Sequence, residues 1–312
     1  MPNRSTPSRT ATKIARFMLL LDAVPRLRDV LPKGAAATVE GILRNSGAVP
    51  ARLIDMMRAP STRRLYELVE QFTGKGQLLW FGIRKRWVAE CVEEALRDGA
   101  RQLLVLGSGL DPLAAMVAER HPDVLCVEID APATANPKAA GIQGAGLERP
   151  NLAVIPVDLS QRPLADALQT TQWRKDVPSI VVAEGLLMYL TPADVDVFFR
   201  ALSNCTAPGT RVAFTVMDMD EEGRPYLGPL SGMMRPLLRL VGEPLQWALR
   251  PRDVPTYLEA RGFRLRDQPS MDVLRQRFLE PIGGKDEPLS HYDYPVLAEL
   301  HERAADGRAS DH

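Results

Sequence analysis

Residues 103–114, with the sequence LLVLGSGLDPLA, decide the fold that we expect for this chain. The stretch opens with four consecutive apolar residues, which is typical of a parallel strand that is covered on both faces. Gly107, Ser108 and Gly109 follow, and glycine can adopt a positive φ angle and let a ligand approach the backbone closely. The pattern therefore predicts a buried strand, a glycine turn and the start of a helix in immediate succession.

The residues after the turn predict where the helix starts and what the turn binds. Asp111 is a good N-cap, and Pro112 suits the first helical position because its missing N–H would have no partner there. Free N–H groups at such a helix end attract the polar parts of a nucleotide. The next apolar run, residues 124–130, ends in Glu128 and Asp130, where a carboxylate can accept hydrogen bonds from ribose hydroxyls. The turn and the acids together predict a nucleoside site.

The spacing of the turn separates two classes of nucleotide. A Gly-Ser-Gly turn alone is common at strand–helix corners, but here the acids follow one β–α–β step later, as a nucleoside ligand requires. Ala115 and Met116 stand where a third glycine would complete the dinucleotide fingerprint. A small nucleoside is therefore favoured over NAD, and an NAD-linked dehydrogenase is the weaker rival.

Composition narrows the function classes further. Among the 312 residues, Lys plus Arg and Asp plus Glu both number 39, so no overall field favours nucleic acid or an anionic membrane. Three scattered cysteines and four histidines predict buried free thiols in a reducing cytoplasm and no metal centre. The apolar runs are too short for a transmembrane helix or a signal peptide. We expect a cytoplasmic protein with a small-molecule substrate, no nucleic-acid or membrane partner, and a homodimer as a possible assembly.

The chain divides into three parts by pattern. We expect a helical N-terminal arm or lid over residues 1–75, a cofactor-binding domain over residues 76–302 and a disordered tail over residues 303–312. In the arm, residues 1–10 look disordered, and prolines divide the following apolar pattern into short helices. Whether these helices serve as a packing or dimer appendage or as a lid over the substrate stays open.

The segment before the first strand carries candidate ligand-binding charges. An amphipathic helix is predicted from Trp87 to a stop at Gly99, and Arg84 and Arg86 lie before its pattern begins. Either arginine is a candidate partner for a ligand carboxylate, in the bidentate geometry that arginine favours. After the second strand, residues 132–150 are rich in Pro and Gly and predict at most a short helix.

Two later strands also end in carboxylates. Residues 152–157 are the third expected strand, and Asp158 follows, where it can accept a hydrogen bond from an exocyclic amine of a base. Residues 179–183 are the fourth, and Glu184 follows, at the kind of strand end where α/β active sites gather. Further strands are expected at residues 211–216, 263–265 and 292–300, with a methionine-rich lid insertion over residues 217–250.

Taken in order, the motifs RKRW (84–87), LGSGLDPLA, VEID, VDL and AEGLLMYLTP (183–192) resemble those of class I S-adenosylmethionine-dependent methyltransferases. More narrowly, the chain resembles the leucine carboxyl methyltransferase group, which includes polyketide O-methyltransferases. The resemblance implies an α/β fold: a seven-stranded Rossmann-like sheet with helices on both faces and an antiparallel last strand. One departure concerns Asp111, Pro112 and Leu113, which stand where relatives commonly have Asp-Thr-Arg.

The resemblance also implies roles for individual residues. Arg84 would hold the methionyl carboxylate, the glycine turn would approach the cofactor, and Glu184 would lie where cofactor and acceptor meet. Glu184 and Tyr189 are the catalytic candidates, Tyr189 being the weaker one. The complete cofactor-binding set that it implies is Arg84, Gly107, Ser108, Gly109, Glu128, Asp130 (with Glu128 or Asp130 on the ribose), Asp158 and Leu159 (flanking the adenine), and Glu184.

The function that follows is methyl transfer from S-adenosylmethionine to a small molecule, with O-methylation of a carboxylate or hydroxyl in specialised metabolism favoured. A carboxylate acceptor needs no general base, whereas a hydroxyl would need one, for which Glu184 and His291 are candidates. An amine, a thioether sulfur and a protein C-terminal carboxylate remain open as acceptors. A non-catalytic nucleoside-binding scaffold is the alternative from another class.

Overall fold

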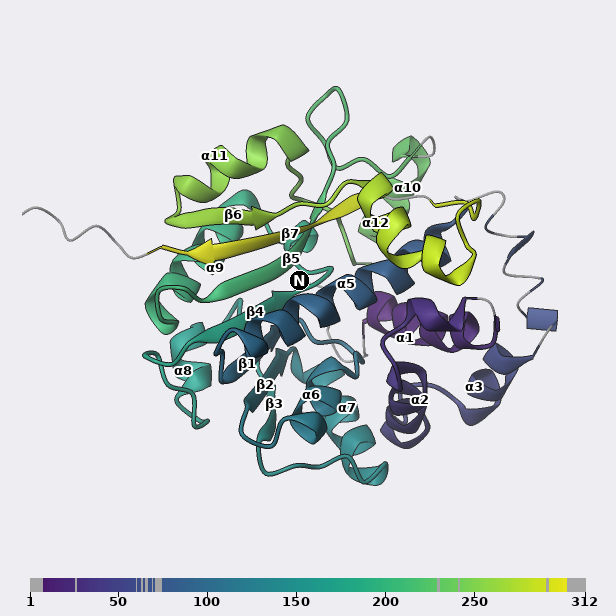
Figure 1. Cartoon of the computed structure of the whole chain (residues 1–312), viewed down its shortest axis with the longest axis horizontal. Coiled ribbons are helices and arrows are strands. Elements are labelled where there is room, and N and C mark those ends of the chain that lie inside the picture. Colours follow the sequence, from purple (N-terminus) through teal and green to yellow (C-terminus); the bar gives the residue numbers. More distant parts are fainter. Residues whose placement is uncertain are drawn as a thin grey trace, which may run out of the picture.

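The structure is a computed structural model, and it describes residues 8–25, 27–59, 61–62, 64, 67–68, 70, 75–228, 231–240, 242–289 and 292–301. Its centre is a seven-stranded sheet with the order β3-β2-β1-β4-β5-β7-β6 (Figure 1). β7 pairs antiparallel with both β5 and β6, while the pairs among β1 to β5 are parallel. The strands are β1 (Gln102–Leu106), β2 (Leu125–Asp130), β3 (Leu152–Pro156), β4 (Ser179–Ala183), β5 (Arg211–Met217), β6 (Phe263–Asp267) and β7 (Asp293–Leu300). The predicted α/β fold, with its antiparallel last strand, is confirmed.

Helices cover both faces of the sheet, which explains why the central strands are apolar throughout. Leu103 and Val105 of β1 point into one core cluster, and Leu104 and Leu106 point into the other. Figure 1 shows α5 lying across the sheet, on the face of the first cluster. That face also carries α6 and α12, and the opposite face carries α8, α9 and α11. Their bounds are α5 (Gln77–Arg97), α6 (Leu113–Arg120), α8 (Leu164–Leu168), α9 (Pro192–Cys205), α11 (Val254–Glu259) and α12 (Met271–Phe278).

The N-terminal arm packs onto α5 through α1 (Arg9–Asp22), while α2 (Ala35–Ser46) and α3 (Ala51–Arg58) pack against α1. Gly82 of α5 makes the close approach possible, because a Cβ there would lie 2.7 Å from Leu21 Cδ1. The prediction that residues 1–10 are disordered is wrong for the last three of them, because Ser8 caps α1 and contacts a distant part of the chain. Residues 1–7, the predicted tail at 303–312 and His291 lie outside the described residues.

Two helices differ from the sequence prediction. α5 begins at Gln77 rather than near Trp87, so Arg84 and Arg86 lie inside the helix. The first half of α5 shows no amphipathic pattern because the sheet and the arm bury it from different sides. Leu79, Trp80 and Ile83 are among its buried residues.

The other corrected helix is α7 (Pro132–Gly144), which spans 13 residues where at most a short helix was predicted. Its glycines, which lower helix propensity in isolation, allow α2 to pack against it. A Cβ at Gly141 would lie 2.4 Å from the carbonyl oxygen of Ile42, and one at Gly144 would lie 2.7 Å from Asn45 Cβ. Tertiary packing therefore outweighs the local signal.

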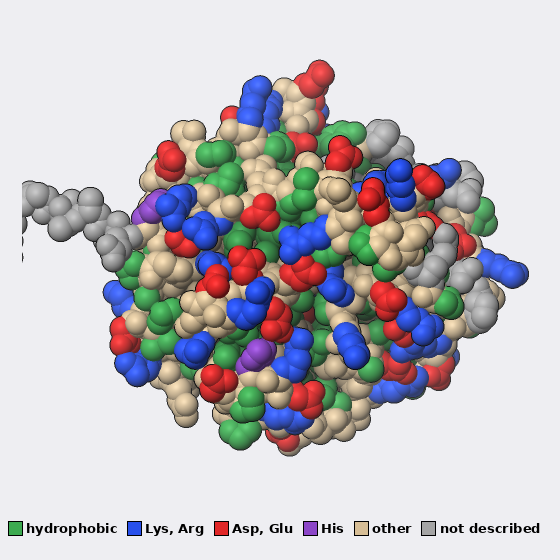
Figure 2. Space-filling view, viewed as in Figure 1, with side chains coloured by type: hydrophobic (Ala, Val, Ile, Leu, Met, Phe, Trp, Pro, Cys, Tyr) green, Lys and Arg blue, Asp and Glu red, His purple; other side chains and the backbone are tan. Residues whose placement is uncertain are grey.

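The insertion between β5 and β6 holds α10 (Ser231–Leu240), whose outer side leaves Met233, Leu237 and Leu240 exposed. Short 3-10 turns complete the fold: η1 (Arg28–Val30), η2 (Leu187–Tyr189), η3 (Pro251–Asp253) and η4 (Glu280–Ile282). Positive and negative side chains alternate over the face in Figure 2, without a large area of one sign. In the part of the chain that the structure describes, no helix has the length and apolar character to cross a bilayer.

Candidate active site

A cavity of about 170 Å³ lies where the carboxyl ends of β1, β2 and β4 meet, below the first turns of α1. Parallel strands bring these ends to one edge of the sheet, where open α/β folds bind their ligands. Its walls come from the glycine turn after β1, the end of β2, the segment after β4, α5 and α1. The lining residues are Ser8, Thr10, Ala11, Ile14, Ala15, Met18, Arg84, Lys85, Gly107, Ser108, Gly109, Leu110, Asp111, Asp130, Glu184, Gly185, Leu186 and Tyr189.

The glycine turn needs its glycines for conformation and for space. Gly107 and Gly109 have φ angles of +64° and +54°, which disfavour other residues. A Cβ would lie 2.9 Å from Leu186 Cδ1 at the first position and 3.1 Å from Ala11 Cβ at the second. The backbone N–H of Gly109 donates to Asp130 Oδ2 at 2.6 Å. The turn is thus tied to the end of β2, as a nucleoside site requires.

Arg84 lies between two carboxylates at the floor of the cavity. Its Nε donates to Glu184 Oε1 at 2.7 Å, and its Nη1 donates to Asp293 Oδ2 at 2.5 Å. Asp293 also accepts a hydrogen bond from Trp80 Nε1 at 2.7 Å. Burial lowers the pKa of Arg84, but the charges of Asp293 and Glu184 outweigh burial, so this pKa rises above its ordinary value. The arginine is therefore a permanent cation inside the protein.

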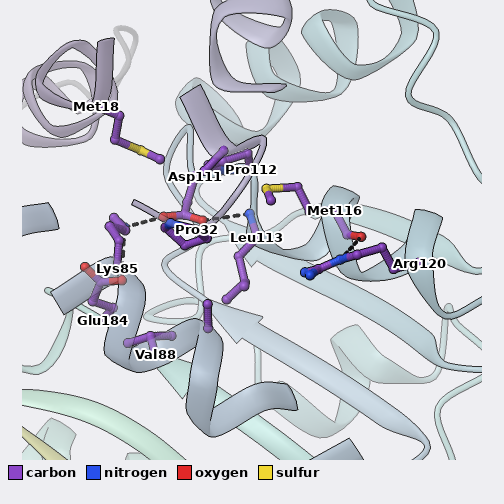
Figure 3. Close-up of a pocket in the computed structure, with 12 residues that line it drawn as sticks. Met18, Pro32, Lys85, Val88, Asp111, Pro112, Leu113, Met116, Arg120 and Glu184 are labelled. Atoms are coloured by element: carbon purple, nitrogen blue, oxygen red, sulfur yellow. Dashed lines mark hydrogen bonds and ion pairs between the residues drawn. The ribbon is translucent and has the colours of Figure 1, made fainter. Parts of the chain in front are cut away.

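Lys85 forms a second junction of charges, which Figure 3 shows between Asp111 and Glu184. Its Nζ pairs with Asp111 and lies 3.0 Å from Glu184 Oε2. Burial raises the pKa of the Asp111 carboxyl, but Lys85, Lys138 and the N–H of Leu113 together outweigh this effect and hold the pKa below its usual value. Asp111 Oδ1 also accepts the N–H of Leu113, but α6 begins at Leu113 with Pro112 as its N-cap, so the prediction of Asp111 as N-cap and Pro112 as first helical residue is wrong by one position.

Lys85 and Asp293 are site residues that the sequence analysis missed. Lys85 directly follows Arg84, and both line the cavity from α5, which the prediction began too late. Asp293 opens the last strand, and a carboxylate at the start of an apolar strand was the available signal. Arg86, the other arginine considered, lies away from the cavity and bonds Glu90 at 3.0 Å.

The predicted ribose-binding acids occupy different environments. Asp130 lines the cavity. Glu128 is fully buried beneath it and pairs with Lys138, with 2.7 Å between Oε1 and Nζ. The position of Asp130 favours it for the ribose, and that role stays a prediction for either acid.

The predicted adenine-side residues do not line this cavity. Asp158 Oδ1 accepts hydrogen bonds from the N–H and the hydroxyl of Ser160, at 3.0 and 2.7 Å. Leu159 packs at the border of the core cluster around α9. Both residues follow β3, next to the end of β2, so their role beside the adenine stays a prediction.

The N-terminal arm and the insertion meet above the cavity, through residues more than 230 positions apart. Ser8 Oγ donates to Glu243 Oε1 at 2.9 Å, and Thr10 Oγ1 donates to Glu243 Oε2 at 2.5 Å. The hydroxyl of Tyr189 lies 3.5 Å from Thr10 Oγ1. Burial raises the pKa of Tyr189 above its ordinary value, so the phenol stays neutral at physiological pH and can donate a hydrogen bond.

A second hollow, of about 650 Å³, lies between the start of α9 and α10. Arg224, Arg235 and Arg239 line it together with prolines and Gln246. Tyr189, which lines the first cavity, accepts a hydrogen bond at its carbonyl oxygen from Nε2 of Gln246, a residue of the second hollow, at 2.6 Å.

The residues around the first cavity fit a cationic nucleoside cofactor. Among the described residues, the carboxylates of Asp111, Glu128, Glu184 and Asp293 pair with the cations of Arg84, Lys85 and Lys138, and a fifth carboxylate, Asp130, accepts the N–H of Gly109. The excess negative charge suits a sulfonium ion. Ser108 Oγ and Glu128 Oε2 are buried with no hydrogen-bond partner in the described part of the chain, which leaves donor and acceptor capacity near the glycine turn.

Comparison with known proteins supports the same kind of cofactor. The leucine carboxyl methyltransferase family matches residues 47–203, about half of the chain. A protein of Mycolicibacterium vanbaalenii assigned as an S-adenosyl-L-methionine-dependent methyltransferase is 28% identical over 224 residues, which are 68% of this chain and 70% of that protein. One of Mycobacterium bovis, with the same assignment, is 29% identical over 247 residues, 72% of each chain.

Among solved structures, a protein from Thermobifida fusca assigned as a methyltransferase has a similar fold, with a TM-score of 0.50 and 19% identity over 88% of this chain and 96% of that one. The sheet order, the glycine turn and the acid-rich cavity define a class I S-adenosylmethionine-dependent methyltransferase, and S-adenosylmethionine is the cofactor. Within this class, the chain belongs to the leucine carboxyl methyltransferase family. The resemblance stated from the motifs is confirmed.

Proposed function

We propose that this enzyme methylates an oxygen of a small carboxylic acid, as a step of specialised metabolism. The observation that carries the proposal is the cavity of about 170 Å³, in which the glycine turn, Glu184 and Tyr189 share one space under α1. A concave space of this volume suits the reacting end of a small metabolite better than the carboxyl terminus of a folded protein, which would need a long groove.

The chemistry of the lining favours a carboxylate over a hydroxyl. When bound, the cofactor supplies a methyl group on a positively charged sulfur, and its transfer to a carboxylate oxygen leaves a neutral thioether and requires no proton removal. Arg84 and Lys85 each pair with one oxygen of Glu184, so this carboxylate is already engaged and is a poor general base. Tyr189, being neutral, can donate a hydrogen bond that orients an acceptor oxygen.

The protein's own residues would hold the two partners as follows. Arg84 would exchange part of its pairing with Glu184 for the methionyl carboxylate, in the bidentate geometry of arginine. Asp130 would accept the ribose hydroxyls. In the hollow behind Tyr189, Arg224 and Arg235 pair with Asp220, and Arg239 would contact a second acidic group of the acceptor. The three cysteines are buried free thiols, which supports a reducing, cytoplasmic setting.

The test uses S-adenosylmethionine with a tritiated methyl group and a panel of aliphatic and aromatic acids, each with one or two carboxylates. The matched alcohols and amides of each acid serve as controls. We expect label in products that release volatile methanol after mild base, because methyl esters hydrolyse and methyl ethers, amines and sulfides do not. Label in base-stable products would contradict the proposal. So would label found only on peptides that have a free C-terminal carboxylate.

A further inference from the structure

A fully buried ion pair lies directly beneath the glycine turn. The side chains of Lys138, on α7, and Glu128, on β2, are both 0% exposed, and their Nζ and Oε1 atoms are 2.7 Å apart. Lys138 Nζ also lies 3.5 Å from the carbonyl oxygen of Ser108, in the middle of the turn. One ammonium group therefore links a helix, a strand and the cofactor-binding turn.

Stability alone does not explain this pair. Removing two charges from water costs free energy that their attraction often fails to recover, and apolar replacement of such pairs is often neutral or stabilising. Burial raises the pKa of the Glu128 carboxyl even though Lys138 opposes the shift, while Asp111 and Asp130 add to it. Glu128 Oε2 and Ser108 Oγ also remain without partners among the described residues, which adds to the cost.

The contacts around the ion pair indicate a role for it other than stabilising the fold. The Ser108 carbonyl faces Lys138 on one side of the turn, and the adjacent N–H of Gly109 donates to Asp130 on the other. Asp130 and Glu128 are two residues apart on β2 and thus extend from the same face of the sheet. The turn is held from both sides by groups of one strand, directly through Asp130 and through Lys138 from Glu128.

We propose that Lys138 is a positioning residue for S-adenosylmethionine. It fixes the Ser108 carbonyl and, with Glu128, sets the glycine turn and Asp130 at the separation that the nucleoside requires. The inference concerns the cofactor side, and does not depend on which acceptor is methylated.

The test separates positioning from stability with a single and a double variant. Lys138→Met leaves Glu128 as an unpaired buried carboxylate and should lower the stability of the fold. The double variant Glu128→Leu with Lys138→Met removes both charges and should unfold at the same or a higher urea concentration than the parent enzyme. Its affinity for S-adenosylhomocysteine, measured by calorimetry, should still be about tenfold weaker or more, since small displacements of binding groups have effects of this size.

The matched control is Glu119→Leu with Arg149→Met, which removes an exposed pair at 2.5 Å and should change neither quantity. Recovery of both stability and S-adenosylhomocysteine affinity in the Glu128/Lys138 double variant would overturn the proposal. Failure of that variant to fold would also overturn it, because the pair would then be a stability element. Calorimetry needs no acceptor, so a failure of the proposed carboxyl methylation leaves this result readable.

Discussion

The floor of the cavity and its cover are built in different ways. On the floor, Arg84, Glu184 and Asp293 form ion pairs whose side chains are at most 7% exposed. In the cover, Glu243 makes only part-buried hydrogen bonds to Ser8 and Thr10. The outer side of α10, in the same insertion, leaves Leu240 84% exposed.

The contrast follows from what each region has to recognise. The methyl donor is always the same molecule. Buried ion pairs suit its recognition, because charges that have no other partner nearby keep a fixed geometry. The acceptor differs between enzymes of one fold, and segments outside the sheet can change without disturbing its core. We therefore expect substitutions in the floor to affect donor binding and stability, and substitutions in the cover to affect ligand exchange and acceptor use.

The largest effect should come from Arg84→Met, which leaves Glu184 and Asp293 without their shared cation. Removing one partner of a buried ion pair typically costs about 3–5 kcal/mol, and urea unfolding would measure it. Arg86→Met is the matched control two residues away. Its half-exposed pair with Glu90 should contribute about 0–1 kcal/mol. Equal losses of stability in the two variants would contradict the view that ion pairs in the floor contribute more than ion pairs on the surface.

Gly107→Val should come next, with the affinity for S-adenosylhomocysteine falling about 100-fold, or ~3 kcal/mol. The valine side chain would clash with Leu186 at the glycine turn. The positive φ angle of this position also disfavours valine. Gly209→Val is the control for backbone strain, because Gly209 has a φ of +80° and open space around it. Calorimetry on both variants separates the two effects. Similar binding losses would show that strain alone is responsible.

Tyr189→Phe should lower kcat/KM for the acceptor about tenfold, the size expected for one lost hydrogen bond, and leave S-adenosylhomocysteine affinity unchanged. Because the pKa of Tyr189 is raised, the phenol of the parent enzyme stays protonated up to and beyond pH 10. Any rise or fall of the rate between pH 7 and 10 should therefore be the same in the parent enzyme and in Tyr189→Phe. Loss of such a rise in the variant would identify the phenolate as a base and favour a hydroxyl acceptor.

The smallest effect should come from Glu243→Gln, in the cover. The amide keeps one acceptor oxygen but loses the charge at the start of α1, so S-adenosylhomocysteine should dissociate about fivefold faster in stopped-flow measurements. Glu222→Gln, which affects an exposed pair with Arg224 in the same insertion, should leave the rate unchanged. An unchanged rate for Glu243→Gln would mean that α1 does not control cofactor exchange.

The sequence predicted the strands and turns around the cofactor site correctly where each depends on residues that are close together in the chain. The apolar runs of β1 and β4, the glycines after β1 and the capping box of Thr191 and Asp194 each carry their structural meaning within a few residues. Predictions were weaker where burial comes from two sides, as in the first half of α5, and where glycines serve helix packing, as in α7.

What the sequence by itself determined is the order of strands and turns, and with it the edge at which Asp130 and Glu184 lie, since parallel strands align their carboxyl ends. Only the tertiary structure decided which charges pair. Lys85, Lys138, Asp293 and Glu243 acquire their partners from segments between 10 and 235 residues away. No local pattern encodes such contacts, because a buried charge is stabilised by whichever opposite charge the packing of helices and strands brings within reach.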